Sequence, residues 1–285
     1  MAICSLIWGT TWFAITLQLG VVPPVVSIVY RFSLAAAVLF GWLLLRRQPL
    51  RLTRAQHLSV FGQGLFTFAL DYSLVYMAEE RVASAVVAVM FAGLAFATLV
   101  LFRFTLGQRA GRAAWVGAAL GVAGVALMSA AELARTEMDP RTAVGLGLAL
   151  TGVACAAVGN LCAWRAQQQG APLGAATAWS MAYGAGVLVL AALLTRADWS
   201  IEPTAAYIGS LLYLTLFGSV LAFFIYFGLA RRRGYAVAAY IGALTPPVAM
   251  AVSVVLEGAR FGFAAFAGVG LVLVGQALLI RSKSG

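Results

Sequence analysis

Long apolar stretches, separated by short charged segments, run through the whole chain. None of them alternates apolar and polar residues with the period of two that a membrane β-strand shows. A bilayer core of about 30 Å needs about 20 apolar residues for each helical crossing. The pattern therefore predicts an all-α membrane protein with ten transmembrane helices, at residues 2–19, 25–45, 57–78, 83–105, 112–131, 143–164, 173–195, 205–229, 236–256 and 262–280.

Charged residues gather between these stretches, and the two signs separate. Every Asp and Glu except Asp71 falls on one side of the predicted membrane: Glu79, Glu80, Glu132, Glu137, Asp139, Asp198, Glu202 and Glu257. Most cationic residues fall on the other side: Arg46, Arg47, Arg51, Arg54, Arg103, Arg109, Arg112, Arg165, Arg231, Arg232, Arg233, Arg281 and Lys283. Positive residues in short loops are retained in the cytoplasm. We therefore expect both termini in the cytoplasm.

Composition supports a membrane protein and argues against nucleic-acid binding, which a basic chain would otherwise suggest. The sequence is 63% hydrophobic, whereas roughly half is typical of a soluble domain. Its net charge of +10 would suggest nucleic acid as the partner of a soluble protein. Here topology and anionic lipid headgroups account for the basic residues. We expect the lipid bilayer and a small solute as partners, with no nucleic acid, no cofactor and no metal.

A weak internal repeat connects the fifth predicted span to the tenth. Residues 106–128 align without a gap with residues 257–279, and Gly117 and Gly124 recur as Gly268 and Gly275. Five spans per half is an odd number, so the two copies must cross the membrane in opposite directions. We therefore expect two inverted five-helix repeats, at residues 1–131 and 143–285. Inverted repeats are the architecture of secondary transporters, which bind their solute near the midplane. The glycines favour close helix packing within one chain, so we expect a monomer rather than a dimer.

Arg31 and Asp71 are the formal charges that lie deep inside predicted spans. Both lie roughly 10–12 Å from the acidic side, at matching depth on sequential helices. An unpaired charge at that depth costs several kcal/mol, so a permanent ion pair between them is one reading. The alternatives are that Arg31 attracts a solute carboxylate, or that Asp71 takes part in proton coupling.

Polar and aromatic side chains at mid-depth are the candidates for a solute cavity. Gln63, Thr67 and Asp71 form a polar stripe at intervals of four residues, and Trp179 and Tyr183 have the same spacing. Such residues favour a flat amphipathic solute over a sugar phosphate, which would need several buried cations. The complete candidate set is Trp12, Arg31, Gln63, Thr67, Asp71, Tyr72, Tyr76, Asn160, Trp164, Trp179, Tyr183, Tyr213, Ser219, Tyr226 and Tyr240.

Thr245, Pro246 and Pro247 lie near the centre of the ninth predicted span. Each proline lacks an amide hydrogen, which frees the carbonyls of Gly242 and Ala243 and predicts a bent or broken helix. Broken helices near the midplane mark transporter sites. We expect either a hinge or a fixed kink here.

These features resemble the EamA-type members of the drug/metabolite transporter superfamily. The resemblance rests on Trp8-Gly9, Tyr30-Arg31-Phe32, Ala83-Ser84, Pro246-Pro247 and Glu257-Gly258, together with the glycine-spaced fifth and tenth spans. The chain departs from the family pattern at Leu94, where the family usually carries a proline, and at Leu106, where a glutamate is common. Within the superfamily it looks most like the YddG-type exporters of aromatic amino acids.

The resemblance implies an inner-membrane secondary transporter of bacteria, which exports aromatic or other hydrophobic amino acids, or related small metabolites, by alternating access. Export of another metabolite or a drug is the alternative, followed by a channel or a lipid scramblase. An enzyme is not expected, because the chain has no GxSxG, HExxH or GxxxxGK motif.

Overall fold

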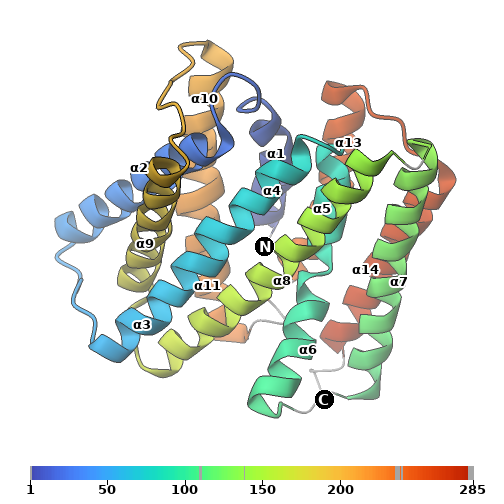
Figure 1. Cartoon of the computed structure of the whole chain (residues 1–285). Helices are drawn as coiled ribbons and strands as arrows, with labels where there is room; N and C mark the ends of the chain where they lie inside the picture. Colours follow the sequence, from blue (N-terminus) through green and yellow to red (C-terminus); the bar gives the residue numbers. More distant parts are fainter. Residues whose placement is uncertain (1, 109–110, 138, 235–237, 239, 282–285) are drawn as a thin grey trace.

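The computed structural model describes residues 2–108, 111–137, 139–234, 238 and 240–281, with the backbone alone for 2, 240, 243, 244 and 279–281. Within these ranges every regular element is a helix (Figure 1). In chain order the elements are α1 (Ala2–Thr16), α2 (Pro24–Leu45), α3 (Arg54–Gln63), η1 (Gly64–Asp71), α4 (Tyr72–Glu79), α5 (Ser84–Ala92), α6 (Leu94–Leu106), α7 (Arg112–Arg135), α8 (Pro140–Gln168), α9 (Leu173–Leu194), α10 (Ala205–Tyr213), η2 (Leu214–Leu221), α11 (Ala222–Arg233), α13 (Tyr240–Val252), η3 (Ser253–Glu257) and α14 (Phe263–Arg281).

Seven helical stretches among the described residues are long and apolar enough to cross a membrane. They are Pro24–Leu45, Arg54–Glu79, Ser84–Leu106, Arg112–Arg135, Pro140–Gln168, Leu173–Leu194 and Ala205–Arg233. Three further apolar helices are shorter, at Ile3–Thr16, Thr245–Glu257 and Phe263–Leu278. The all-helical, membrane-spanning character predicted from the sequence is confirmed, whereas the number of ten crossings stays a prediction.

Local sequence signals set where several of these helices begin and end. Thr53 forms a capping box with Gln56 at the start of α3, and the Thr204 hydroxyl accepts from the Tyr207 amide at the start of α10. Pro24 and Pro140 occupy first-turn positions, where the missing amide hydrogen costs nothing.

The helices at the third and eighth predicted spans, Arg54–Glu79 and Ala205–Arg233, share an irregularity. Each contains an eight-residue π-helical segment, η1 in the third and η2 in the eighth. In a π-helix each amide bonds five residues back instead of four, and such segments are frequent at functional sites. The third and eighth stretches are equivalent in the predicted repeat, so this shared feature is consistent with two related halves.

The second equivalent pair, α7 and α14, is packed backbone to backbone. A Cβ added at Gly124 would clash with the carbonyl oxygen of Gly268, and one added at Gly275 would clash with that of Gly117. The repeat alignment exchanges Gly117 with Gly268 and Gly124 with Gly275, so these two contacts are exchanged as well. The predicted close approach of the glycines therefore occurs within the chain, with the pattern of a pseudo-two-fold axis.

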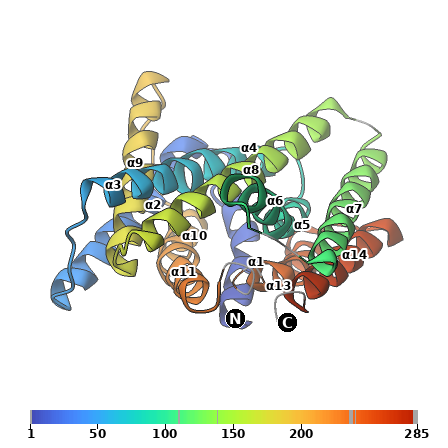
Figure 2. The ribbon, with the colours of Figure 1, turned by 90° about the horizontal axis from the view of Figure 1, so that it is seen from below.

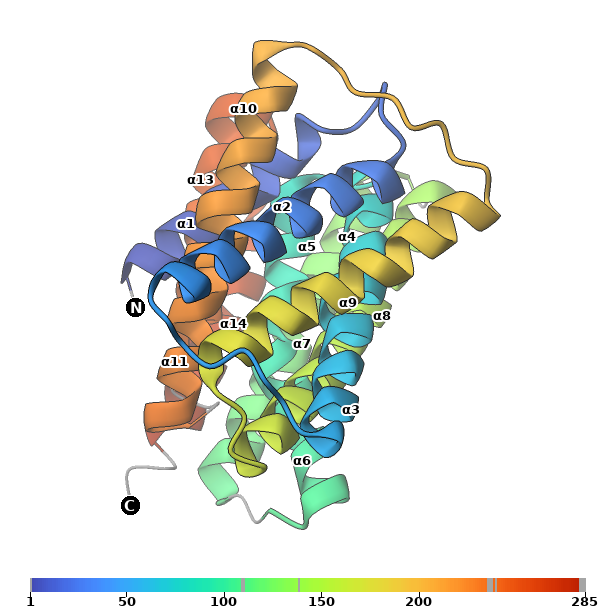
Figure 3. The same cartoon turned by 90° about the vertical axis from the view of Figure 1, so that its left-hand side faces the viewer.

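The helices form one bundle in which the two predicted halves interleave. Seen from below, α7 and α14 lie together on one flank and α2, α3 and α9 on the other, with α1, α5, α8 and α13 between them (Figure 2). Figure 3 shows α2 and α9 side by side at that second flank. One contiguous cluster of buried side chains takes residues from both halves. The halves therefore share a core.

The two ends of the bundle differ in charge, as the sequence predicts. The α4–α5, α7–α8, α9–α10 and α13–α14 connections lie at one end, at the top of Figure 1, and carry the carboxylates named above. We call this the acidic end. The α2–α3, α6–α7 and α8–α9 connections lie at the other, which we call the basic end. Arg109 and Lys283 lie outside the described residues.

Candidate functional site

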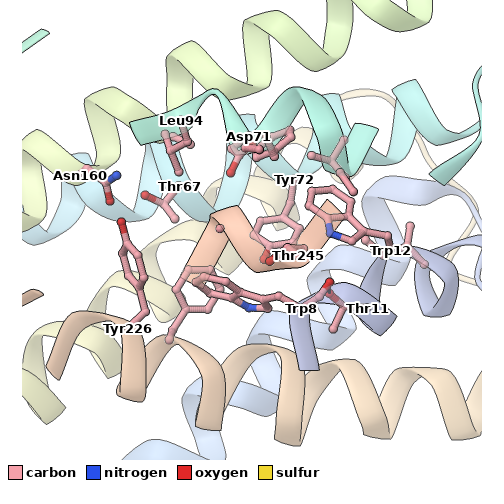
Figure 4. Close-up of a pocket in the computed structure, with 18 residues that line it drawn as sticks. Trp8, Thr11, Trp12, Thr67, Asp71, Tyr72, Leu94, Asn160, Tyr226 and Thr245 are labelled. Carbon is pink, nitrogen blue, oxygen red and sulfur yellow. Dashed lines mark hydrogen bonds between the residues drawn. The ribbon is translucent and has the colours of Figure 1, made fainter. Parts of the chain in front are cut away.

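A cavity of about 110 Å³ lies among α1, the η1–α4 junction, α5, α6, α8, α11 and α13. One water needs about 10–15 Å³ of such space, so the cavity has room for several. In Figure 4 the labelled side chains point toward this shared space. The lining consists of Trp8, Thr11, Trp12, Ile15, Thr67, Asp71, Tyr72, Val75, Ala88, Phe91, Ala92, Leu94, Ala156, Asn160, Phe223, Tyr226, Gly242 and Thr245.

One face of α1 forms a wall of the cavity. Trp8, Thr11, Trp12 and Ile15 follow the spacing of adjacent turns, which places them on one side of the helix. The Trp12 ring tilts against Phe91 with centroids 5.2 Å apart, and the Trp8 ring lies 5.3 Å from the rings of both Phe223 and Tyr226. Six aromatic side chains, including Tyr72, thus surround the space.

Thr67 and Asp71 enter the cavity from η1. Their close approach to α8 depends on two glycines of that helix. The Asp71 Oδ1 atom lies 3.2 Å from where a Cβ on Gly152 would stand, and a Cβ on Gly159 would clash with the Thr67 hydroxyl. Side chains at these two positions would push α8 away from η1.

Three polar atoms of the cavity lining are buried without a hydrogen-bond partner in the part of the chain that the structure describes: Trp12 Nε1, Thr67 Oγ1 and Asp71 Oδ1. Each such atom costs about 1–3 kcal/mol when it is left unsatisfied. They include two donors, an indole and a hydroxyl, and one carboxylate acceptor. A bound solute or water that supplied the missing partners would recover that energy.

Arg31 lies behind Tyr72, outside the lining of the cavity. It is 1% exposed, its Nε donates to Ser219 Oγ at 2.9 Å, and its guanidinium carbon stands 4.5 Å from the Tyr72 ring centroid. Its Nη2 lies 3.5 Å from the Tyr72 hydroxyl, and its Nη1 has no hydrogen-bond partner within the described ranges.

The permanent ion pair between Arg31 and Asp71 is absent from this structure. The ion pairs among the described residues are Arg81–Glu80 and Arg135–Glu132. Equal depth on neighbouring helices does not fix the direction in which two side chains point. Asp71 points at α8, whereas Arg31 points at η2 and the Tyr72 ring.

Other predicted candidates lie toward the two ends. On the acidic side, the fully buried Tyr76 hydroxyl donates to Gln18 Oε1 at 2.6 Å. On the basic side, Trp179 and Tyr183 stack at 5.7 Å as their spacing suggests. Trp179 Nε1 donates to the Leu50 carbonyl, and the Tyr183 hydroxyl bonds His57 Nδ1 at 2.9 Å.

The remaining candidates have separate surroundings. Gln63 lies about 12 Å along the helix from Asp71 and lines a small pocket near the basic end. Trp164 contacts Phe102, and Tyr213 bonds the Thr10 hydroxyl. Ser219 accepts the hydrogen bond from Arg31. The side chain of Tyr240 is not among those that the structure describes.

The ninth stretch is continuous at its two prolines. Helix α13 runs through Pro246 and Pro247 without a break, so the broken form of the predicted hinge is not observed. Thr245 and Gly242 nevertheless line the cavity. Pro246 cannot donate to the Gly242 carbonyl, so the freed oxygen belongs to a residue of the cavity wall.

Trp8, Thr11, Ile15 and Phe91 are lining residues that the mid-depth candidate list lacked. The first three extend the helical stripe of Trp12, which is a signal that the sequence contains. Phe91 lies in an unbroken apolar run, where periodicity does not indicate which side chains face the cavity.

Among the described residues, no group of three His, Cys, Asp or Glu side chains could hold a metal ion.

Comparison with known proteins gives one family and several relatives. The model of the EamA-like transporter family matches residues 1–130 and, a second time, residues 143–281. The uncharacterized inner membrane transporter YedA of Escherichia coli K12 is 28% identical over 280 residues, covering 98% of this chain and 88% of YedA. Protein PagO of Salmonella typhimurium is 34% identical over 106 residues, which is 37% of this chain and 35% of PagO.

A solved crystal structure shares the fold. It has a TM-score of 0.74 at 19% identity, and the match covers 99% of this chain and 96% of that one.

Proposed function

We propose that this chain, which belongs to the EamA-like transporter family, exports aromatic or other hydrophobic amino acids, or related small metabolites, across a bacterial inner membrane. It is a membrane transporter, not an enzyme. The inner membrane is inferred from the relative YedA, whose description names that membrane. The solute and the direction of transport are inferences from the cavity and from the resemblance to YddG-type exporters.

The observation that carries the proposal is a cavity with aromatic walls and three unpartnered polar atoms. The rings of Trp8, Trp12 and Phe91 suit a flat apolar side chain. Asp71 Oδ1 suits the ammonium group of an amino acid, because a buried carboxylate strongly favours a cationic donor. Trp12 Nε1 and Thr67 Oγ1 are donors that suit its carboxylate.

Two groups of side-chain contacts, one toward each end of the bundle, are the candidates for the gates that alternating access requires. On the basic side Trp8 packs against Phe223 and Tyr226. On the acidic side the Tyr76–Gln18 hydrogen bond joins α4 to the segment after α1, and Tyr76 lies one helical turn beyond the lining residue Tyr72. In the proposed mechanism the two inverted repeats, residues 1–131 and 143–285, rock about the cavity so that each group opens in turn.

The orientation follows from charge. Because Lys and Arg in short loops favour the cytoplasm, we place the basic end and both termini there and the acidic end in the periplasm. Solute would leave the cell through the acidic end.

The test is efflux of labelled phenylalanine from proteoliposomes that contain the purified chain. We expect saturable efflux that unlabelled tryptophan and tyrosine inhibit and that external phenylalanine accelerates by exchange. Non-saturable flux without exchange would indicate a channel, and lipid movement without solute flux would indicate a scramblase. Inhibition by other metabolites or drugs, but by no amino acid, would assign a different solute.

A matched pair of variants connects the flux to the cavity. Phe91→Ala removes a ring from the cavity wall, and Phe263→Ala removes a ring that is 88% exposed at the start of α14. We expect a raised KM for phenylalanine in Phe91→Ala alone. Equal KM values for phenylalanine in the two variants would contradict the proposal that the cavity binds the solute.

A further inference from the structure

A second pocket, of about 520 Å³, opens at the acidic end. We call it the acidic-end pocket. Its lining consists of Thr16, Glu79, Val82, Ala83, Ser84, Arg135, Glu257, Gly258, Ala259, Arg260 and Phe261. The pocket therefore brings together charged side chains from α4, α7, η3 and the α13–α14 connection.

Glu79 is the unusual member of this pocket. It is 7% exposed, and among the described residues neither of its carboxylate oxygens has a hydrogen-bond partner. Unpaired carboxylates are among the most costly groups to bury. A merely structural acid would be expected to have at least one donor nearby. Glu79 thus lacks a partner in a place where a pocket could hold one.

Glu257 supplies a second carboxylate, and a chain of hydroxyls holds it in position. The Ser253 hydroxyl donates to Glu257 Oε2, so its own oxygen accepts from the Ser84 hydroxyl at 3.0 Å. This chain links η3 to the start of α5 and points the Glu257 carboxylate at the pocket that Glu79 also lines.

The two arginines of the pocket do not neutralise these acids. Arg135 is committed to Glu132, with bonds of 3.0 Å from Nε and 2.6 Å from Nη2. Arg260 is exposed and forms no ion pair with any described residue. Glu79 and Glu257 therefore line the pocket without an ion pair to any described residue.

The acidic-end pocket lies one helical turn beyond the central cavity. Val75 and Ala88 line the cavity, and Glu79 and Ser84, four residues further toward the acidic end, line the pocket. At 1.5 Å per residue the two spaces are about 6 Å apart along these helices. On α1 the two spaces are bordered by consecutive residues, Ile15 in the cavity and Thr16 in the pocket.

From this geometry we infer that the acidic-end pocket is a second binding site, which takes a primary ammonium group between Glu79 and Glu257. An ammonium carries three donors and can serve both carboxylates at once. The ammonium could belong to a solute that leaves the cavity or to an ethanolamine lipid headgroup. The inference does not depend on which solute is transported.

A local fluorophore separates this site from the central cavity. We would place an environment-sensitive label on Ala259→Cys, in a full-length chain whose cysteines Cys4, Cys155 and Cys162 are replaced by serine or alanine. The probe is phenylethylamine, which has the ammonium and no carboxylate. We expect a saturable change with phenylethylamine and none with phenylpropionate, which lacks the ammonium.

Two neighbouring glutamates give a matched comparison. Glu79→Gln keeps the shape of a protonated glutamic acid, and we expect it to weaken phenylethylamine binding at least about tenfold. Glu80 pairs with Arg81 and does not line the pocket, so Glu80→Gln should leave the affinity unchanged. Folding of each variant is checked by its thermal unfolding.

Unchanged affinity in Glu79→Gln, or an equal response to phenylpropionate, would overturn the inference. Tighter binding of phosphoethanolamine than of phenylethylamine would assign the site to a lipid headgroup, and the reverse order to a solute. A positive response without amino acid efflux would refute the proposed transport and leave this site standing.

Discussion

Asp71 has a carboxylate oxygen buried in an aromatic cavity beside the backbone of α8 at Gly152, and no described residue donates a hydrogen bond to it. A hydrogen bond to a charged group contributes about 1.5–3 kcal/mol, which corresponds to roughly ten- to hundredfold in affinity. We therefore predict that Asp71→Asn raises the KM for phenylalanine efflux at least about tenfold while the protein folds normally. Kinetics in proteoliposomes, with equal reconstituted protein, measure it.

The same variant decides whether Asp71 couples export to protons. If it does, clamping the proton gradient changes wild-type efflux and leaves Asp71→Asn efflux unaffected. A wild-type efflux rate that does not change with the proton gradient would exclude proton coupling.

Ser219 is the hydrogen-bond acceptor for the Arg31 Nε at a site that is fully buried. Ser219→Ala leaves that charged donor unsatisfied, so we predict a loss of about 1–3 kcal/mol of stability. The KM for solute should not change, because neither residue lines the cavity. Thermal unfolding in detergent measures the first effect and efflux the second; a raised KM with unchanged stability would instead make Arg31 a solute-binding group.

At the scale of the helix, the glycine contact between α7 and α14 permits a controlled substitution. Gly268→Val would place a side chain against the Gly124 carbonyl, whereas at Gly270, on the same helix, an added Cβ meets no atom within 4 Å, which makes Gly270→Val the control. Overpacking costs about 1–3 kcal/mol, so we predict a lower unfolding temperature for Gly268→Val alone. Equal stability of the two variants would contradict the packing described here.

Hydropathy predicted the position of the helices well and their internal form poorly. The predicted span 57–78 corresponds to Arg54–Glu79, and 112–131 to Arg112–Arg135. Hydropathy does not predict the π-helical segments η1 and η2, because a helical turn that gains one residue has the same apolar composition as an α-helical turn. At the proline pair the helix α13 is continuous, so a full break is not observed, and the hinge or fixed kink that the sequence suggests stays a prediction.

The candidate site was predicted in part for a related reason. The candidates Trp12, Thr67, Asp71, Tyr72, Asn160 and Tyr226 do line the cavity, and so does Thr245, which the sequence marked only as part of the hinge or kink. Depth along a helix can be counted from sequence, and it selected these candidates together with Tyr76, Trp179 and Tyr213. The direction of each side chain depends on how the helices are rotated against one another, which a single sequence does not contain.

At the scale of the whole molecule, the separation of charge predicts how the chain lies in the membrane. The α7–α8 connection and the end of α14 lie at opposite ends of the bundle (Figure 1). In a chain without native cysteines, we predict that Thr136→Cys is labelled by a membrane-impermeant maleimide added to whole cells, and that a cysteine at the end of α14 is not. Labelling of both from outside would disprove the inverted arrangement.

The seam of bare glycines between α7 and α14 limits which motions the bundle can make. At these glycines the two backbones are already in direct contact, so no space remains for either helix to move toward the other. We expect α7 and α14 to keep their relative position during transport and to act as the pivot. The helices α2 and α9 at the opposite flank should then move relative to each other. A spin-label pair across the seam should then keep one distance throughout the transport cycle, and a pair across the far flank should show two.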